Sequence, residues 1–313
     1  MQIIKKFFIV ILIVMILYVG LALYSDVEKF SKVFIDIDYW YVLPILILMT
    51  INNLLLGIRF YRMIRILGID ISFKKSITIY LASLSLEVTP AGAGQIIQSH
   101  MIKKASGDAI SKTLPVVIVE KWSELVSILV ILASFLFIEN IIESQIILII
   151  GLVISFILAG IMRISTIFSG FKKIIKKVWF LKELEENIEN SQNTLKILMS
   201  SKMILEGLLI TIPAKIIYAV SAFLAFQAVG IKLDFIFSTH IFFTSLITGV
   251  ISLLPGGFGV TEGSMVGLLA KYGNDFTVAA AAVIFVRLTT IWYSTILGFI
   301  ITKFVIKNAF TPN

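Results

Sequence analysis

Charged residues stand inside apolar segments that are long enough to cross a membrane. Glu120, Lys121 and Glu124 lie within one such segment, and Arg287 lies within another near the end of the chain. Glu120 and Glu124 are four positions apart and share one helix face, and Lys121 is close enough to Glu124 for an ion pair. Each charge costs about 2.5–3.5 kcal/mol near the bilayer centre. These side chains must face one another, water or a charged ligand, which favours a binding or proton-transfer role. The alternative is a structural role, with ion pairs such as Glu120 with Arg287 or Lys121 with Glu124.

Two glycine-rich stretches interrupt apolar segments. Residues 89–95 read TPAGAGQ within the segment Ser76–Lys104, and residues 255–263 read PGGFGVTEG after the segment Phe235–Leu254. Proline lacks an N–H and glycine is a weak helix former, so neither segment continues as one helix. We expect two re-entrant helical hairpins, because irregular backbone at membrane depth must be buried in protein or line a cavity. Their tips would offer amides to anions. The alternative is that the glycines only allow close helix packing.

The buried charges and the two tips together form a candidate substrate-binding site. A phosphate-bearing headgroup suits such a site, with cationic side chains as counter-charges. The candidate residues are Thr89, Pro90, Gly92, Gly94, Gln95, Glu120, Lys121, Glu124, Pro255, Gly256, Gly257, Gly259, Glu262 and Arg287.

The composition indicates the class of protein that holds this site. The 313 residues are 58% hydrophobic and only 15% charged, and the mean hydropathy is +1.02. A soluble domain is about 45–50% apolar and about 25% charged. The sequence therefore predicts an all-α, polytopic membrane helix bundle, and the continuous apolar runs disfavour a β-barrel. Cysteine is absent, His100 and His240 form no HExxH pair, and no P-loop or GxSxG motif occurs, so we expect no metal, no cofactor and no enzyme.

The apolar runs predict about six full spans besides the two hairpins, which makes eight helical membrane segments within one domain of residues 1–313. The first span lacks a small-x-small cleavage pattern and is interpreted as an uncleaved helix rather than a signal peptide. The expected spans are Phe7–Tyr24, Tyr41–Ile58, Thr113–Ile138, Gln145–Met162, Met203–Val229 and Phe276–Thr302.

The distribution of Lys and Arg predicts the orientation. With both termini cytoplasmic, 20 of the 27 Lys and Arg residues are cytoplasmic, 4 are external, and Lys121, Lys215 and Arg287 lie at membrane depth. If Ser76–Lys104 crossed the membrane fully, the count would be 9 inside and 15 outside. Basic residues concentrate in cytoplasmic loops, so the hairpin arrangement is favoured. We expect a multi-pass protein of the cell membrane.

The two hairpins enter from opposite sides in this arrangement. Pro90 precedes Glu120 by 30 residues and Pro255 precedes Arg287 by 32, so each hairpin is followed by a charged span at a similar distance. Paired interrupted segments in two halves are typical of inverted-repeat transporters. The alternative is two unrelated packing kinks.

The polar stretch of residues 163–202 separates the two halves. It carries apolar residues at a helical period, with a basic first half and an acidic second half. It is predicted to be a cytoplasmic amphipathic connecting segment, either resting on anionic lipid or solvated.

Four short stretches resemble patterns of a known family. Residues 255–263 match Pro-Gly-Gly-x-Gly-x-x-Glu-Gly without departure, and residues 120–124 resemble Glu-Arg-x-x-Asp. Residues 287–292 resemble Arg-x-x-Thr-x-Trp, and residues 89–95 resemble Thr-Pro-Gly-x-x-Gly-Glu, with Ala91 and Gln95 as departures. Together these stretches resemble the transmembrane flippase-like domain of the lysylphosphatidylglycerol synthase family over nearly the whole chain.

The resemblance implies movement of a lipid between leaflets. In two-domain members aminoacylation resides in a separate C-terminal soluble domain, so lysyl transfer is not expected of this chain. The expected substrate is a phospholipid, an aminoacyl-lipid or a polyprenyl-phosphate-linked lipid. Expected partners are membrane lipid and a second copy or a separate lipid-modifying enzyme, with no nucleic acid. The alternatives are an intramembrane lipid-modifying enzyme or its membrane subunit, and a channel for small solutes.

Overall fold

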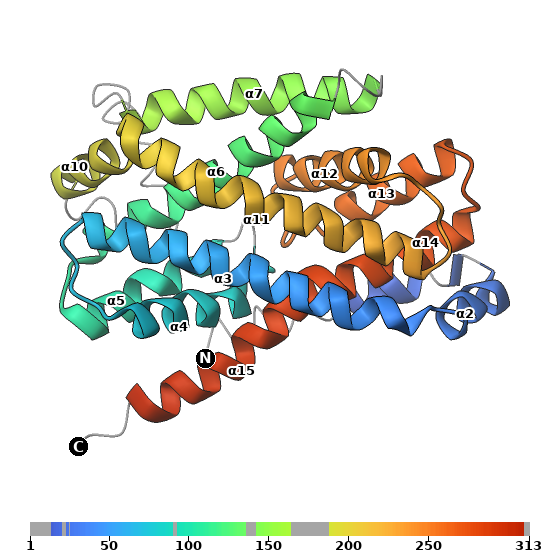
Figure 1. The fold of residues 1–313 in the computed structure, drawn as a ribbon, viewed down its shortest axis with the longest axis horizontal. Helices are drawn as coiled ribbons and strands as arrows, with labels where there is room; N and C mark the ends of the chain where they lie inside the picture. Colours follow the sequence, from blue (N-terminus) through green and yellow to red (C-terminus); the bar gives the residue numbers. More distant parts are fainter. Residues whose placement is uncertain are drawn as a thin grey trace.

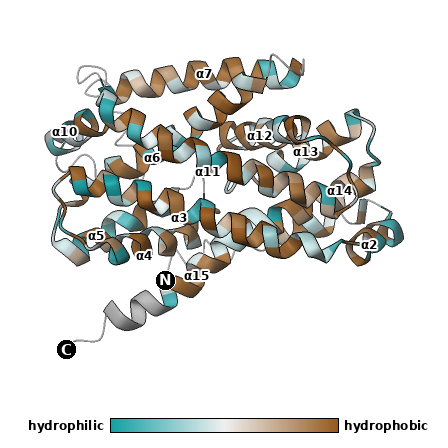
Figure 2. Ribbon diagram, viewed as in Figure 1, coloured by the Kyte–Doolittle hydropathy of each residue, from teal (hydrophilic) through white to brown (hydrophobic). Residues whose placement is uncertain are grey.

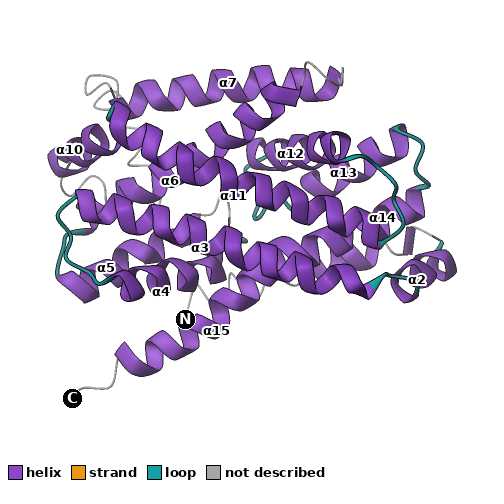
Figure 3. Cartoon of the chain, in the orientation of Figure 1, coloured by secondary structure: helices purple, strands orange, loops and turns teal. Residues whose placement is uncertain are grey.

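The computed structural model describes residues 14–20, 23–24, 26–89, 93–135, 142–163 and 188–309. Every element within these ranges is a helix, as Figure 3 shows, which confirms the predicted all-α class. The helices form an elongated bundle in which α7 runs along one edge and the end of α15 projects from the opposite edge (Figure 1).

Within the described ranges the elements follow one another along the chain in a fixed order. Their bounds are α2 Val27–Ile35, η1 Tyr39–Tyr41, α3 Val42–Ile66, α4 Phe73–Ser83, η2 Leu84–Leu86, η3 Ala93–Ile96, α5 Ile97–Ser106, α6 Ile110–Phe135, α7 Ile142–Arg163, α10 Ile188–Leu198, α11 Ser201–Ala228, α12 Phe235–Ile251, α13 Val260–Lys271, α14 Phe276–Arg287, η5 Leu288–Trp292 and α15 Tyr293–Ala309.

Within the described residues, four helical stretches are long and apolar enough to cross a membrane. They are Tyr39–Ile66, Ile142–Arg163, Ser201–Ala228 and Phe276–Lys303, and each contains most of a predicted span. The predicted span Thr113–Ile138 corresponds to α6, whose 26 residues extend about 39 Å. The first predicted span lies largely outside the described residues, although residues 14–20 are helical. The chain is thus a multi-pass helical membrane protein.

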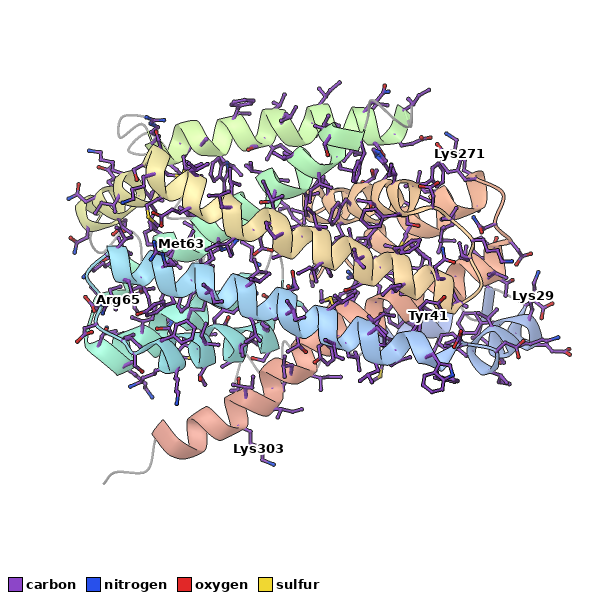
Figure 4. The ribbon with its side chains drawn as sticks, viewed as in Figure 1. Lys29, Tyr41, Met63, Arg65, Lys271 and Lys303 are labelled. Carbon is purple, nitrogen blue, oxygen red and sulfur yellow. The ribbon has the colours of Figure 1, made fainter. Side chains whose placement is uncertain are left out.

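The exposed surface of the bundle suits lipid rather than water. Apolar residues cover most of α7 (Figure 2), and Phe156 on that helix is 75% exposed. Charged residues gather at the two ends of the bundle instead. Arg65 lies at one end, Lys29 and Lys271 lie at the other, and Lys303 lies on the projecting part of α15 (Figure 4).

The antiparallel pair α3 and α11 forms the centre of the bundle. The Asp38 amide, just before α3, donates to the Ala228 carbonyl at the end of α11 over 3.0 Å. At the opposite end, Arg62 of α3 forms a 2.8 Å ion pair with Glu206 near the start of α11. These contacts show that the two helices run in opposite directions along their full length.

Each interrupted segment folds back on itself. Helix α4 packs on α5, and α12 packs on α13. Helices α4 and α5, with 11 and 10 residues, are about 17 and 15 Å long, which is about half of a 30 Å hydrocarbon core. The second turn depends on its glycines, because Gly256, Gly257 and Gly259 have positive φ angles of 57°, 67° and 85°. Each interrupted segment is therefore a pair of helices packed on one another.

The tips of the two hairpins meet inside the bundle. The Gly256 amide of the second tip donates to the Thr89 carbonyl of the first tip over 3.5 Å. Beside this contact, Val88 and Phe258 are buried in one apolar cluster with Val14 and Ile291. Two segments that are far apart in the sequence thus share a single centre.

The two halves of the chain repeat the same pattern of packing. The first hairpin packs on α3 and α6, and the second packs on α11 and α14. The halves also exchange contacts, since α4 packs on α15 and α12 packs on α6. The inverted repeat itself stays a prediction.

The connecting segment is described only from residue 188 onward, so the predicted amphipathic stretch of residues 171–188 lies almost wholly outside the described residues. Helix α10 packs against α6 and α7. The Ser191 hydroxyl donates to the Ser111 carbonyl near the start of α6 over 3.0 Å. This end of the segment is part of the bundle rather than a separate solvated helix.

Gly298 of α15 packs closely against the backbone of the first hairpin, and adding a side-chain atom there tests this packing. A Cβ at Gly298 would lie 2.2 Å from the Ser85 amide nitrogen, whereas a Cβ at Gly267 would meet nothing within 4 Å. We expect Gly298→Ala to destabilise the protein by about 1–3 kcal/mol through overpacking. The matched change Gly267→Ala is expected to be neutral or slightly stabilising. Thermal unfolding in detergent, followed by tryptophan fluorescence, compares them, and equal melting temperatures would contradict the packing argument.

Candidate functional site

Glu124 is the centre of a network of buried charges. Its carboxylate accepts a 2.7 Å hydrogen bond from the Lys215 ammonium and lies 3.4 Å from Arg59 and 3.5 Å from Lys121. These three cations come from α11, α3 and α6. The predicted pairing of Lys121 with Glu124 is confirmed. A single carboxylate therefore joins three helices of the bundle.

Glu120 pairs with Arg59 rather than with Arg287. The Arg59 guanidinium lies 3.4 Å from Glu120 and donates to the Thr211 hydroxyl over 3.0 Å. The predicted alternative of a Glu120–Arg287 ion pair is wrong. Arg59 and Glu120 each present only 1% of their side chains to solvent. Their charges are thus balanced within the protein interior.

The orientation count placed Arg59 in a cytoplasmic loop, and this placement is wrong. Helix α3 continues to Ile66, so Arg59 lies seven residues inside the helix and is buried. The predicted span ended at Ile58 because hydropathy falls at the basic residues that follow it. An arginine that is neutralised by carboxylates of other helices can remain inside the membrane region. Without Arg59, 19 Lys and Arg residues remain on the predicted cytoplasmic side instead of 20, so the favoured orientation does not change.

The network lies halfway along its helices. Glu120 is ten residues after the start of α6, which corresponds to about 15 Å of helix. Lys215 is fourteen residues after the start of α11, which is about 21 Å. Both positions lie in the middle third of their helices.

Exposure increases across the network. The exposed side-chain fraction is 1% for Arg59 and Glu120, 6% for Lys215, 15% for Glu124 and 32% for Lys121. The network therefore has a closed side at Arg59 and an accessible side at Lys121. A ligand would first meet Lys121 and Glu124.

A second charged pair stabilises the other hairpin. Arg287 donates through Nε to Glu262 over 2.8 Å and through NH2 to the Gly256 carbonyl over 2.7 Å. Its guanidinium stacks over the Phe258 ring at 4.9 Å. Glu262 and Arg287 are both fully buried. This pair ties the tip of the second hairpin to α14.

Internal partners already occupy the amides of the second tip. The Gly259 amide donates to the Glu262 carboxylate over 2.7 Å and so caps α13. The amides of Gly257, Phe258 and Thr261 donate to backbone carbonyls of the same turn. An anion could reach these amides only if the turn opened, so the tip amides are not a ready-made anion site. Pro255 is part of this turn.

The first tip is held by its own threonine. The Gly94 amide donates to the Thr89 hydroxyl over 2.6 Å, and that hydroxyl donates to the Leu86 carbonyl over 2.7 Å. Pro90 and Gly92 lie outside the described residues. Gln95 is buried, and its side-chain nitrogen has no hydrogen-bond partner within the described part of the chain.

Other buried polar atoms near the network also lack partners. Within the described ranges these include Arg59 Nε and Glu120 Oε2, as well as Gln98 Oε1 and Ser99 Oγ on α5. Helix α5 packs on α6, which carries Glu120. A buried polar group without a partner costs about 1–3 kcal/mol, so these atoms favour an interior that takes up water or a polar ligand.

Several residues of the site were not predicted as site residues. Arg59, Thr211 and Lys215 belong to the network, and Tyr18 links the second pair to Trp292. The Tyr18 hydroxyl donates to Glu262 over 3.4 Å and accepts from the Trp292 indole over 3.3 Å. In the sequence, Lys215 stood inside a predicted span, Arg59 followed one directly, and Trp292 ended the Arg-x-x-Thr-x-Trp pattern. Tyr18 gave no signal. No cluster of metal-binding side chains occurs in the residues the structure describes.

The three cations around Glu124 depend on its carboxylate for charge neutralisation, and a substitution at Glu124 tests this. Glu124→Gln removes the carboxylate that Arg59, Lys121 and Lys215 share, and leaves buried cations without compensation. Breaking a buried ion pair costs about 3–5 kcal/mol, and we expect a loss of that size. The control Glu206→Gln breaks the exposed Arg62 pair and should cost about 0–1 kcal/mol. Unfolding in mixed micelles measures the free energy of unfolding of both variants. A similar loss of stability in the two would contradict the role of Glu124.

Comparison with known proteins agrees with the sequence patterns. A family model described as the lysylphosphatidylglycerol synthase TM region matches residues 7–298. A UPF0104 membrane protein of Pyrococcus horikoshii is 22% identical over 97% of both chains. A UPF0104 membrane protein of Methanocaldococcus jannaschii is 23% identical over 93% of both chains. A third, from Methanothermobacter thermautotrophicus, is 23% identical over 83% of this chain and 84% of its own. The fold, the motifs and these matches together show that the chain belongs to the lysylphosphatidylglycerol synthase transmembrane-region family.

Proposed function

We propose that this protein is a flippase-like transporter that moves a lipid with a phosphate or otherwise charged headgroup between leaflets. The observation that carries the proposal is the charge network around Glu124, which lies midway along the helices and is accessible at Lys121. Intramembrane charges in helical membrane proteins usually mark a substrate or ion pathway. The family match supports a membrane function of this type.

In the proposed arrangement the bundle spans the cell membrane with both termini in the cytoplasm. The first hairpin enters from the cytoplasm and the second from outside. Three observations support this placement. The arms α4 and α5 are too short to cross, the two tips meet at Thr89 and Gly256, and α3 is antiparallel to α11. Both hairpins would then bring irregular backbone to the same central site.

The headgroup would bind through cationic side chains rather than through the tip amides. Lys121 is the most exposed cation of the network and would meet the phosphate first. Arg59 and Lys215 would hold Glu124 in place while Lys121 changes partner from Glu124 to the phosphate. The acyl chains would remain in lipid beside the helices. A charged path at mid-depth lowers the cost of moving a charged headgroup through hydrocarbon.

Arg287 and Glu262 would act on the second half of the path. Their ion pair fixes the second tip, because Arg287 also binds the Gly256 carbonyl. The five residues after Arg287 form a π-helical segment. Such segments often occur at functional sites because they interrupt the regular helix. Movement of this tip relative to α14 would expose Arg287 to the headgroup.

Lipid movement can be measured after reconstitution into liposomes. We expect Lys121→Ala to slow translocation of a fluorescent phospholipid by about tenfold, as expected from loss of a charge-assisted bond. Lys232→Ala, in an exposed loop, is the matched control and should translocate normally. Quenching by external dithionite gives the rate. Wild-type protein that moves no lipid would overturn the proposed function, and turnover of the labelled lipid would favour a lipid-modifying enzyme.

The second tip supplies an independent prediction. In the double variant Arg287→Ala, Glu262→Gln no buried charge is left unpaired, yet the contact of Arg287 with the Gly256 carbonyl is lost. We expect a folded protein with strongly reduced lipid movement. The matched control Arg62→Ala, Glu206→Gln removes an exposed pair at one end of the bundle. Normal transport by a well-folded first variant would refute the assignment of this pair to the path.

A further inference from the structure

A pocket lies between the ends of the two central helices. Its walls come from the last turns of α3 and the first turns of α11, and its volume is about 250 Å³. Three of the lining side chains are cationic and one is acidic, and none belongs to the network around Glu124. The lining residues are Tyr61, Arg62, Arg65, Ile66, Lys202, Met203 and Glu206. The pocket therefore has a positive charge of its own.

Two of the three cations are available to a ligand. Arg62 is held by Glu206 over 2.8 Å. Arg65 forms a 3.0 Å pair with Asp70, but both of these residues are exposed, and such a pair contributes only about 0–1 kcal/mol. Lys202 is also exposed. Arg65 and Lys202 can thus turn to an anion at little cost.

The pocket lies at the level expected for lipid headgroups. The membrane-spanning stretches Tyr39–Ile66 and Ser201–Ala228 each contain 28 residues, which corresponds to about 42 Å of helix. A hydrocarbon core of about 30 Å leaves about 6 Å of helix beyond it at each end. Arg65 and Lys202 are each the second residue from an end of their stretch. Figure 4 shows Arg65 at this end of the bundle.

An apolar stripe on α11 leads from the pocket toward the middle of the helix. Leu205, Leu209 and Ile216 follow Lys202 by three, seven and fourteen residues, so the four side chains share one helix face. Each of the three apolar residues is at least 42% exposed. An acyl chain that lies on this stripe would bring its headgroup to Lys202. A soluble anion would make no use of the stripe, so the combination favours a lipid.

We propose that this pocket binds an anionic phospholipid, with the phosphate on Arg65 and Lys202 and an acyl chain along the apolar stripe of α11. Basic pockets between membrane helices suit anionic headgroups. In the proposed arrangement this end of the bundle is cytoplasmic, and the cytoplasmic leaflet is the one that carries negative surface potential. The site is separate from the network around Glu124, and it does not require that the protein moves lipid.

A fluorophore on the stripe reports which lipid lies there. The chain contains no cysteine, so Leu209→Cys gives the full-length protein a single position for a bimane label. The labelled protein is reconstituted into phosphatidylcholine vesicles that contain a small fraction of nitroxide-labelled phosphatidylglycerol or nitroxide-labelled phosphatidylcholine. From two cations near the surface we expect phosphatidylglycerol to bind beside the label about tenfold more strongly. A label at Phe156→Cys, on the exposed face of α7, should show no preference.

Substitution of the cations tests the pocket itself. Arg65→Ala, Lys202→Ala should abolish the preference at the Leu209→Cys label, and both residues are exposed, so the variant should fold. Arg65→Lys, Lys202→Arg keeps both charges and should keep the preference. The matched control Lys29→Ala, Lys232→Ala removes two exposed cations toward the opposite end of the bundle, one of them ion-paired, and should behave as wild type.

The outcomes decide the proposal without a transport measurement. Equal quenching by the two lipids at Leu209→Cys, or a preference that survives Arg65→Ala, Lys202→Ala, would overturn it. A preference of the same size at Phe156→Cys would indicate general attraction of anionic lipid and would overturn the pocket as its cause. Glycerol 3-phosphate is added in parallel. If it displaces the labelled phosphatidylglycerol as readily as unlabelled phosphatidylglycerol does, the pocket takes a soluble anion and the lipid assignment is overturned.

Discussion

A buried charge must be neutralised where water is scarce, and this constraint explains how the central helices are arranged. Removing a carboxylate from water costs several kcal/mol, so Glu124 is stable in the interior only with cations around it. Lys215 and Arg59 come from α11 and α3, which run antiparallel, and Lys121 comes from the helix of Glu124 itself. These ion pairs join α3 and α11 to α6, so the network stabilises the bundle as well as forming the candidate site.

The irregular backbone of the hairpins obeys the same constraint. Backbone groups at membrane depth need partners from protein or water, because hydrocarbon offers none. Thr89 binds the amide of its own turn, Glu262 binds the amide of Gly259, and Arg287 binds the carbonyl of Gly256. The amides of the second turn are thus satisfied internally, as is the Gly94 amide of the first. The side chains that remain accessible, above all Lys121, are better placed than these amides to meet a ligand.

The two halves play different parts in the candidate site. The first half contributes an extended network with an accessible side at Lys121, and the second contributes a closed pair of Glu262 and Arg287. The low identity to the UPF0104 relatives leaves room for differences in substrate among family members.

Composition and apolar run length alone were enough to identify a helical membrane protein, because the need to cover a hydrocarbon core acts on every segment locally. The Pro-Gly interruptions likewise predicted both hairpins, since these residues break a helix wherever they occur. The ion-pair partners of the buried charged residues could not be predicted in this way. Glu120 binds Arg59 on another helix rather than Arg287, and Arg59 itself was placed outside the membrane. Which charges meet depends on helix packing across the whole chain, so only the tertiary structure decided how the site is balanced.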